Sequence, residues 1–296
     1  MKKNHIGLIG CGYWGSKYLQ IIKEKFPEII LYCAERKKNI LCGLKSSFSD
    51  VYFWNEGEEM INSVRLDGLI IATEASNHYQ LSKKALHLNI PILLEKPLFL
   101  NNEDFFDIYS KKYLIYEGYT FLRDNAISTF KDIIQKDNSK ISRICFKWYA
   151  PGIKRKDINS LWDIGPHPLS ILFYLLEDDF IPFEHELNKY SSSISLKNSS
   201  GIVANIRIDC DYNEKIRKVE AFIDDKTKII YDHESYNRLY IEKENAKINI
   251  KYQKNDNLET QIYDFTNRFI IEKNGDISIT EKILKVFKGI PINDEY

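Results

Sequence analysis

The stretch that most constrains the fold is a glycine-rich turn between an apolar run and an amphipathic helix, at residues 6–15. The run at 6–9 predicts a buried strand, and apolar side chains recur at helical spacing after the turn. Gly10 allows a tight turn, Gly12 lets backbone approach a pyrophosphate, and Gly15 lets the helix pack closely on the strand. The helix N-terminus then points its N–H groups at the phosphates. This unit predicts a dinucleotide-binding domain.

An acidic residue after the second predicted strand, at 29–33, indicates how the ribose of the cofactor is held. Glu35 lies twenty residues after Gly15, where a carboxylate accepts hydrogen bonds from the adenosine ribose. Glu35 would repel the 2′-phosphate of NADP, whereas Arg36 could pair with that phosphate or stack on the adenine. We therefore predict NAD as the cofactor and leave NADP open.

Composition narrows the class of protein. The 296 residues are 44% hydrophobic and 28% charged, which is typical of a globular chain with two domains. The 42 basic and 42 acidic residues give a formal net charge of zero, so we expect neither nucleic acid nor a membrane as a partner. No apolar stretch approaches the ~20 residues of a membrane span. Five cysteines without a C-x-x-C pair fit free thiols, so we expect a cytoplasmic protein without a metal site.

Strands and helices alternate in the first part of the chain. Strands are predicted at 51–54, 67–73 and 90–94, and a helix is predicted at 77–88. The alternation predicts a parallel sheet with helices on both faces, in which ligands bind at the carboxyl ends of the strands. Residues 73–78 and 95–97 should therefore lie near the glycine turn. The predicted cofactor contacts are Gly10, Gly12, Tyr13, Trp14, Gly15, Glu35, Arg36, Thr73, Glu74, Asn77, His78, Glu95 and Lys96.

Two of these residues have an alternative interpretation. Lys96 ends a buried strand between Glu95 and Pro97, so it is unlike a solvated surface lysine. Beside a cofactor it could hydrogen-bond a substrate oxygen and stabilise negative charge there, and a structural pair with Glu95 is an equal alternative. His78 opens a helix and could bond to backbone as readily as to the cofactor.

The pattern changes after residue 122. A helix is predicted at 125–136, followed by β-favouring segments separated by turns up to residue 252 and by helices at 258–271 and 277–287. We predict an α/β fold with a Rossmann dinucleotide-binding domain at 1–122 and an α+β substrate-binding domain at 123–296, whose large open sheet is mostly antiparallel. Such a sheet often serves as an interface between copies, so we expect a homodimer or homotetramer.

A second candidate site occurs in the predicted α+β domain. Asp163 and His167 are four residues apart across a predicted helix start, which brings both side chains to one side, where the carboxylate can orient the imidazole. An imidazole with a pKa near neutrality can take a proton from an alcohol as hydride leaves. An N-cap aspartate beside a packed histidine is the alternative. Pro168 disfavours the helical conformation for His167.

Three motifs occur in order along the chain: G-C-G-Y-W-G at 10–15, E-K-P at 95–97 and D-I-G-P-H at 163–167. Together they resemble the motifs of the Gfo/Idh/MocA oxidoreductases, and further similarity runs through most of the chain. The resemblance implies that Lys96 is the catalytic lysine near the nicotinamide and substrate, that His167 is the acid/base histidine, and that Asp163 is the carboxylate paired with it.

The resemblance also implies the reaction. It implies an NAD(P)-dependent oxidoreductase that transfers a hydride between nicotinamide and a carbinol or ketone carbon of a sugar or nucleotide sugar, as in surface-polysaccharide biosynthesis. Two alternatives stay open: a non-catalytic NAD(H)-binding sensor or partner subunit, and a reductase of a non-sugar substrate.

Overall fold

The computed structural model describes residues 4–136, 141–151, 158–244 and 246–290. The chain divides into two compact units: the first combines residues 1–120 with Asp256–Ile277, and the second combines Phe121–Asn255 with 278–296. The single domain boundary predicted between residues 122 and 123 lies close to residue 120, where the chain first passes from the first unit to the second. That prediction assigned residues 256–277 to the second domain, whereas they pack within the first unit.

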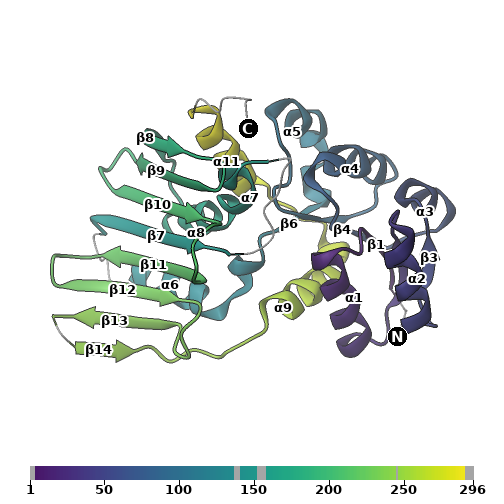
Figure 1. The fold of residues 1–296 in the computed structure, drawn as a ribbon, viewed down its shortest axis with the longest axis horizontal. Helices are drawn as coiled ribbons and strands as arrows, with labels where there is room; N and C mark the ends of the chain where they lie inside the picture. The colour runs from purple at the N-terminus through teal and green to yellow at the C-terminus, as the bar shows by residue number, and fades with distance from the viewer. Residues whose placement is uncertain (1–3, 137–140, 152–157, 245, 291–296) are drawn as a thin grey trace. The chain divides into compact units, whose positions relative to one another are not determined.

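The first unit is built on a six-stranded parallel sheet in the order β3-β2-β1-β4-β5-β6 (Figure 1). This order confirms the predicted doubly wound Rossmann sheet. Its strands are β1 (His5–Ile9), β2 (Ile30–Ala34), β3 (Tyr52–Trp54), β4 (Gly68–Ile71), β5 (Ile92–Glu95) and β6 (Ile115–Gly118). The connecting helices are α1 (Tyr13–Lys25), α2 (Lys38–Ser47), α3 (Gly57–Ser63), α4 (His78–His87) and α5 (Asn102–Ile108), with short 3₁₀ turns η1 (Ala75–Asn77), η2 (Tyr109–Leu114) and η3 (Thr120–Arg123).

The returning segment explains why residues 256–277 belong to the first unit. It forms α9 (Asn257–Asp264), the π-helical turn η4 (Phe265–Phe269) and α10 (Ile270–Glu272). The apolar side chains of Leu258, Ile262 and Phe265 join the buried core that contains α1 and the central strands, and α9 contacts α1. The segment therefore covers apolar surface that the first 120 residues leave open.

The second unit contains an eight-stranded sheet in the order β14-β13-β12-β11-β7-β10-β9-β8 (Figure 1). All neighbouring pairs are antiparallel except β7 and β10, which confirms the predicted mostly antiparallel sheet. The strands are β7 (Arg143–Tyr149), β8 (Ile181–Leu187), β9 (Ser191–Lys197), β10 (Val203–Asp209), β11 (Ile216–Phe222), β12 (Thr227–Asp232), β13 (Leu239–Lys243) and β14 (Ala246–Asn249).

Strand β8 was missed from the sequence because it lies at the edge of the sheet. Its residues are mostly exposed, so they show no alternation of buried and exposed side chains. Pro182 fits an edge position, where the missing N–H is not needed for pairing, and the register shifts between Pro182 and Glu184.

Among its described residues, the second unit has four helices, and they lie along one face of its sheet (Figure 1). They are α6 (Asn125–Lys136), α7 (Ser160–Ile164), α8 (Pro166–Leu176) and α11 (Ser278–Lys288). Helix α8 contacts α6, α7 and α11, while α6 and α7 contact strands. Alternate residues of β7 are buried, including Ile144, Phe146 and Trp148, as expected for a sheet with one covered face.

Within the described part of the chain, no helix combines the length and the apolar character needed to cross a membrane.

Candidate functional site

The glycine turn has the conformation expected of a dinucleotide loop. Gly10 has φ +85°, which favours glycine, and a Cβ there would lie 2.8 Å from the carbonyl oxygen of Ala72. A Cβ on Gly15 would lie 1.7 Å from the carbonyl oxygen of Gly10, so only glycine lets α1 start so close to β1. A Cβ on Gly12 would meet nothing within 4 Å. The turn therefore leaves space beside Gly12 where backbone can receive a phosphate.

The N-terminus of α1 adds electrostatic attraction for an anion. Gly12 is the N-cap, no side chain caps the helix, and no acidic residue lies in its first turn. The first N–H groups of a helix lack partners within the helix and carry partial positive charge. Tyr13 and Trp14 begin this helix, and the ammonium of Lys17 lies over both rings at 4.2 and 4.5 Å from their centres.

Glu35 follows β2 and points back toward the glycine turn. One carboxylate oxygen accepts a hydrogen bond from the Cys11 N–H at 2.8 Å, and the other accepts from the Lys37 N–H at 2.8 Å. The side chain is buried. Two backbone donors thus fix the carboxylate between the turn after β1 and the start of α2, and each oxygen keeps a lone pair for a ribose hydroxyl. Arg36, next in the chain, is exposed.

The segment after β4 reaches the same edge of the sheet. It lies close to the segment after β2, because Glu74 forms an ion pair with Lys37 at 3.7 Å. Thr73 packs against the glycine turn, because a Cβ on Gly10 would lie 2.9 Å from its Cγ2 atom. Asn77 ends the short turn η1 just before α4. The predicted cofactor contacts after β1, β2 and β4 are therefore gathered at one edge of the sheet.

His78 has a structural contact at this edge. It is completely buried, its Nδ1 atom lies 2.9 Å from the carbonyl oxygen of Pro97, and its Nε2 atom lies 3.2 Å from that of Thr73. Both ring nitrogens thus face backbone, and the histidine connects the segments after β4 and β5. We leave His78 out of the proposed cofactor contacts, because its two polar atoms are already engaged within the unit.

Lys96 stands at the carboxyl end of β5 and is 8% exposed. The preceding residue, Glu95, is also buried, and its carboxylate accepts a hydrogen bond from the Tyr18 hydroxyl at 2.5 Å and one from the Lys96 N–H at 3.3 Å. The Gln261 side-chain amide donates to the Tyr18 oxygen at 2.5 Å. Burial, with Glu95 adding to it, raises the pKa of Tyr18 well above its ordinary value, so Tyr18 remains a neutral donor.

This network connects distant parts of the sequence beneath the lysine. Tyr18 comes from α1, and Gln261 comes from α9, which returns from the far end of the chain. The buried carboxylate of Glu95 accepts a hydrogen bond from the backbone of Lys96. The helical spacing places Tyr18 on the apolar face of its helix, but nothing in the sequence indicated that its hydroxyl meets Glu95 or that Gln261 turns inward.

Asp163 and His167 lie on two helices that follow each other almost directly. Asp163 belongs to α7 and His167 to α8, and Gly165 between them keeps helical angles, with φ −54° and ψ −33°. Pro166 and Pro168 have no N–H, which interrupts the hydrogen-bond ladder where α7 ends and α8 begins. Pro168 disfavours the helical conformation for His167, yet His167 lies within α8, whose first turn tolerates proline.

The imidazole of His167 packs within an aromatic cluster of the second unit. Its ring lies edge-on to Phe121, 5.1 Å between centres, and is stacked near Trp148 at 6.1 Å. The side chain is half-buried. The same Phe121 ring also contacts Trp148 at 4.8 Å between centres. The histidine is therefore held by aromatic packing, a feature that the spacing of Asp163 and His167 did not predict.

A buried carboxylate lies next to this cluster and was also missed. Asp124 is 1% exposed, and its carboxylate accepts hydrogen bonds from the Tyr231 hydroxyl at 2.9 Å, Arg238 Nη1 at 2.8 Å and the Ala126 N–H at 3.0 Å. Burial opposes ionisation, but the nearby His233, whose Nδ1 atom lies 3.7 Å from the carboxylate, and the hydrogen bonds from Ala126 and Tyr231 outweigh it and lower the pKa of Asp124. Asp124 is therefore an ionised anchor between the start of α6 and the end of β12.

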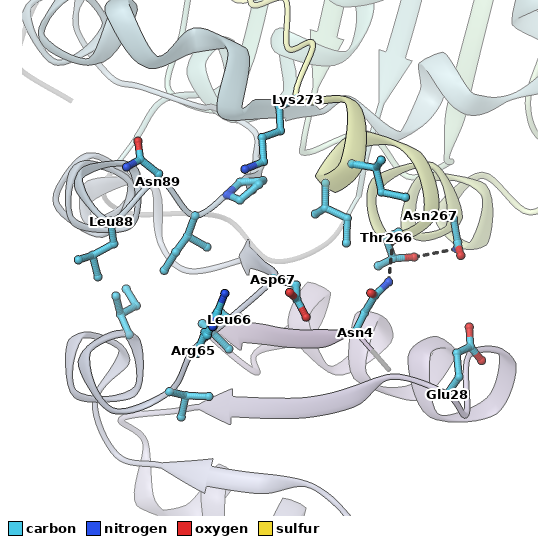
Figure 2. Close-up of a pocket in the computed structure, with 16 residues that line it drawn as sticks. Asn4, Glu28, Arg65, Leu66, Asp67, Leu88, Asn89, Thr266, Asn267 and Lys273 are labelled. Carbon is cyan, nitrogen blue, oxygen red and sulfur yellow. Dashed lines mark hydrogen bonds between the residues drawn. The ribbon is translucent and has the colours of Figure 1, made fainter. Parts of the chain in front are cut away.

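A pocket of about 890 Å³ opens at the opposite edge of the first unit's sheet (Figure 2). Asn4, Asp67 and Pro91 line it just before β1, β4 and β5, and residues of η4 and α10 complete it. The Asn4 amide donates to the Thr266 carbonyl oxygen at 2.9 Å (Figure 2). None of the predicted site residues lines this pocket, which lies at the amino ends of the strands, whereas ligands of such sheets bind at the carboxyl ends.

The first part of the chain, which contains the glycine turn, matches the model of a known protein family. Residues 4–111 match the GFO_IDH_MocA model, described as the oxidoreductase family with an NAD-binding Rossmann fold. These residues belong to that family. The prediction of an NAD(P)-binding Gfo/Idh/MocA oxidoreductase is thereby confirmed. The glycine turn, Glu35 and Lys96 fall within the matched residues, whereas Asp163 and His167 lie beyond them. No curated protein sequence matches the chain.

Solved structures resemble the chain over nearly its whole length. The 3-ketoreductase KijD10 from Actinomadura kijaniata, solved with TDP-benzene and NADP, has a TM-score of 0.83 at 15% identity, covering 98% of this chain and 97% of that one. UDP-N-acetylglucosamine 3-dehydrogenase GnnA from Acidithiobacillus ferrooxidans has a TM-score of 0.76 at 17% identity, with 98% and 97% covered. Myo-inositol 2-dehydrogenase from Lactobacillus plantarum has a TM-score of 0.80 at 15% identity, covering 97% of this chain and 95% of that one. At these identities the likeness establishes the fold.

Proposed function

We propose that the protein transfers a hydride between a nicotinamide dinucleotide and a carbinol or ketone carbon of a sugar or nucleotide sugar. The observation that carries the proposal is the position of Lys96. It is a buried lysine at the carboxyl end of β5, on the edge of the sheet that also bears the glycine turn. A cation held there serves an oxygen that gains negative charge during the reaction.

The first unit has the features that an NAD molecule requires. The pyrophosphate would be held by the backbone at Gly12 and by the N-terminus of α1, where a Cβ on Gly12 would meet nothing. The ribose hydroxyls would be held by Glu35, whose carboxylate is already oriented by two N–H groups. Its negative charge disfavours a 2′-phosphate, so we propose NAD rather than NADP. When bound, the nicotinamide supplies or accepts the hydride.

The chain's own residues would handle the oxygen and the proton. We propose that Lys96 hydrogen-bonds the reacting oxygen of the substrate and stabilises the charge that develops there. His167 would accept the hydroxyl proton during oxidation and return it during reduction. Asp163, one helical turn before His167, would orient the imidazole and favour its charged form. Aromatic packing of His167 against Phe121 supports this role, because a fixed ring keeps its nitrogens in one direction.

The substrate class is supported by the solved structures of similar fold. One is described as acting on UDP-N-acetylglucosamine, another is described as a 3-ketoreductase solved with TDP-benzene, and a third is described as acting on myo-inositol. Two descriptions thus name a polyhydroxylated ring or its nucleotide derivative as substrate, and the third names a ligand with the nucleotide part of a nucleotide sugar. We therefore propose a sugar or nucleotide sugar for this chain, with surface-polysaccharide synthesis as the pathway.

Replacing Lys96 by methionine tests the proposal. Met keeps the length of the side chain but removes its charge, so turnover should fall by about 10²–10³-fold, as for the loss of one electrostatic stabiliser. The affinity for NAD, measured by fluorescence titration, should stay within about twofold, because the dinucleotide is held by other groups. The matched control is Lys83→Met, which removes an exposed lysine of α4 paired with Asp107 at 3.0 Å. Unchanged turnover in the Lys96 variant would refute the assignment.

We also propose that the protein acts in the cytoplasm as a homodimer or homotetramer through the open face of its large sheet. All five cysteines lie in the described part of the chain and none of them forms a disulfide there, which suits a reducing compartment. The open face carries a cross-strand ladder of ion pairs, with Lys228 at 3.0 Å from Glu220 and 2.9 Å from Glu242. Light scattering measures the number of copies, and a monomer at all concentrations would contradict this part of the proposal.

A further inference from the structure

Gln261 occupies a position of α9 where an apolar side chain is expected. Leu258 and Ile262 of this helix, and Phe265 just after it, lie in the buried core of the first unit. Residues three and four apart share one face of a helix, so the spacing places Gln261 on this same face, and its side chain is 0% exposed. Burying an amide among apolar side chains lowers stability unless its hydrogen bonds are replaced. Core packing alone therefore does not account for a glutamine here.

Only one end of the Gln261 amide has a hydrogen-bond partner. Its Nε2 atom donates to the Tyr18 oxygen at 2.5 Å, whereas its buried Oε1 atom meets no donor among the described residues. A buried acceptor without a donor costs at least as much stability as a typical hydrogen bond contributes. The amide therefore adds little net stability, and its bond to Tyr18 is what distinguishes glutamine from leucine at this position.

The bond from Gln261 sets the direction of the next hydrogen bond. A tyrosine hydroxyl has one proton, and a carboxylate only accepts. The Tyr18 oxygen accepts from the amide, and its proton is donated to the Oε1 atom of Glu95 at 2.5 Å. Burial and Glu95 raise the pKa of Tyr18 well above its ordinary value, so this proton is retained. Donors thus point in one direction, from α9 through α1 to the end of β5.

This series of hydrogen bonds ends at the backbone of Lys96. Tyr18 holds the Oε1 atom of Glu95, and the Oε2 atom of the same carboxylate accepts from the Lys96 N–H at 3.3 Å. A side chain in a reacting site works only if its support keeps it close to the productive geometry. The π-helical turn η4 follows α9 directly, and such turns occur frequently at functional sites.

We propose that Gln261 is a positioning residue for Lys96 and acts through the two side chains between them. The inference rests on the proposed function, because it assigns Gln261 to the same site. It adds that the segment 256–277, far from the lysine in sequence, contributes to that site. Gln261 directs the Tyr18 hydroxyl, the hydroxyl orients the Glu95 carboxylate, and the carboxylate holds the backbone that carries the lysine.

The test replaces Gln261 by leucine and, as a second variant of similar volume, by methionine. The control is Gln20→Leu, which removes an exposed amide of α1 that donates to Glu24 at 2.9 Å. Each protein is treated with a small amount of acetic anhydride. Mass spectrometry of its peptides then gives the labelling rate of Lys96 relative to Lys83, an exposed lysine of α4. This ratio reports how freely the Lys96 amine moves, and it requires neither cofactor nor substrate.

We expect both Gln261 variants to raise the relative labelling rate of Lys96 by about fivefold, as for the loss of one hydrogen bond, and Gln20→Leu to leave it within about twofold. The urea midpoint of the Gln261 variants should stay unchanged or rise, because the buried acceptor without a donor is removed as well. In the turnover assay used for Lys96→Met, their kcat should fall by about tenfold while KM for NAD stays within about twofold.

A double variant tests the route through the tyrosine. In a protein that carries Tyr18→Phe, adding Gln261→Leu should not raise the labelling of Lys96 further, because the group that transmits the effect is already gone. Additive effects of the two changes would show that Gln261 does not act through Tyr18 and would overturn the inference.

Three further results would overturn it: unchanged labelling of Lys96 in the Gln261 variants, raised labelling that appears only together with a loss of stability, and raised labelling with an unchanged kcat. Failure of the proposed function is a different result, because it is measured as absent hydride transfer by the unmodified protein. A protein whose Lys96 responds to Gln261 but that never transfers hydride would keep the positioning network and lose the proposed reaction.

Discussion

Two buried carboxylates, one in each unit, accept a hydrogen bond from a buried tyrosine, but their other partners differ. Glu95 accepts from Tyr18 and from a backbone N–H of its own loop. Asp124 accepts from Tyr231, from a backbone N–H and from the guanidinium of Arg238. The bonds described for the first carboxylate come from a hydroxyl and a backbone N–H, whereas those of the second include one from a guanidinium cation.

The two hydrogen-bond networks therefore contribute differently to the protein. A carboxylate held by neutral donors orients the adjacent residue, here Lys96, without using its charge for a salt bridge with those donors. A carboxylate held by a cation binds the strands and helix that carry its partners, here β12, the loop before β13 and α6. We therefore expect Glu95 and its tyrosine to matter most for the proposed chemistry, and Asp124 to matter most for stability.

The largest effect is expected for Asp124→Ala. The change leaves the Tyr231 hydroxyl and the Arg238 guanidinium without their acceptor, and breaking a buried pair costs about 3 kcal/mol when one partner is partly exposed. Urea unfolding measures the loss of stability. The control is Asp179→Ala, whose carboxylate is 71% exposed and pairs with Lys282 at 3.5 Å, and which should cost less than about 1 kcal/mol. Equal losses of stability in the Asp124 and Asp179 variants would show that the buried carboxylate contributes no more than the surface ion pair.

Asp124 should also make the stability of the protein depend on pH. The pKa of Asp124 in the folded protein lies below its ordinary value of 3.8. The unfolded chain therefore binds a proton first as pH falls, so the stabilisation is complete above about pH 4 and is lost as pH falls through the lowered pKa. Asp124→Asn should flatten this part of the stability profile. A profile that stays steep in the variant would assign the effect to other carboxylates.

A matched pair of hydroxyl deletions, Tyr18→Phe and Tyr231→Phe, gives the next largest effect. Each removes one hydrogen bond to a buried carboxylate, which costs about 1–3 kcal/mol. Tyr18→Phe should also lower turnover, because Glu95 loses the donor that orients it beside Lys96, while Tyr231→Phe should leave turnover nearly unchanged. Unfolding curves and steady-state kinetics on both variants measure the two effects. The reverse order in kinetics would contradict the division of roles.

The smallest effect extends the comparison to Glu35, a third buried carboxylate, held by two backbone N–H groups. Glu35→Gln keeps an acceptor for one of them but removes the charge. We expect NAD affinity to fall by about tenfold, or about 1.4 kcal/mol, and NADP affinity to rise, because the repulsion of the 2′-phosphate disappears. Titrations with both dinucleotides measure the change in preference. No change in the ratio of the two affinities would show that Glu35 does not select the cofactor.

The first unit could be predicted in detail because its signals are local. Gly10 and Gly15 are required by contacts within a few residues or with the neighbouring strand, and the apolar runs match strands that are buried on both faces. The strand that ends in Glu95 was predicted within two residues at its start and one at its end. Lys96 followed from its place after a buried strand.

The networks could not be predicted, because their members are far apart in the chain. Tyr18 meets Gln261 across 243 residues, and Tyr231 meets Asp124 across 107. Each of these residues looks like an ordinary polar position of a helix or strand. His233 is a further case, since its ring contacts Phe121 and the Tyr231 oxygen, and neither residue forms a motif with it. The spacing of Asp163 and His167 was visible, but the aromatic packing of the imidazole was not.

The return of residues 256–277 to the first unit has a consequence for synthesis on the ribosome. Domains usually fold in order as they leave the exit tunnel, but here the Rossmann sheet lacks Gln261 and several core side chains until residue 277 has been made. The second unit's own sheet is complete before that point. A nascent chain whose residues up to 255 have left the exit tunnel would thus hold a finished open sheet and an unfinished nucleotide-binding unit, with α1 still exposing the apolar face that α9 later covers.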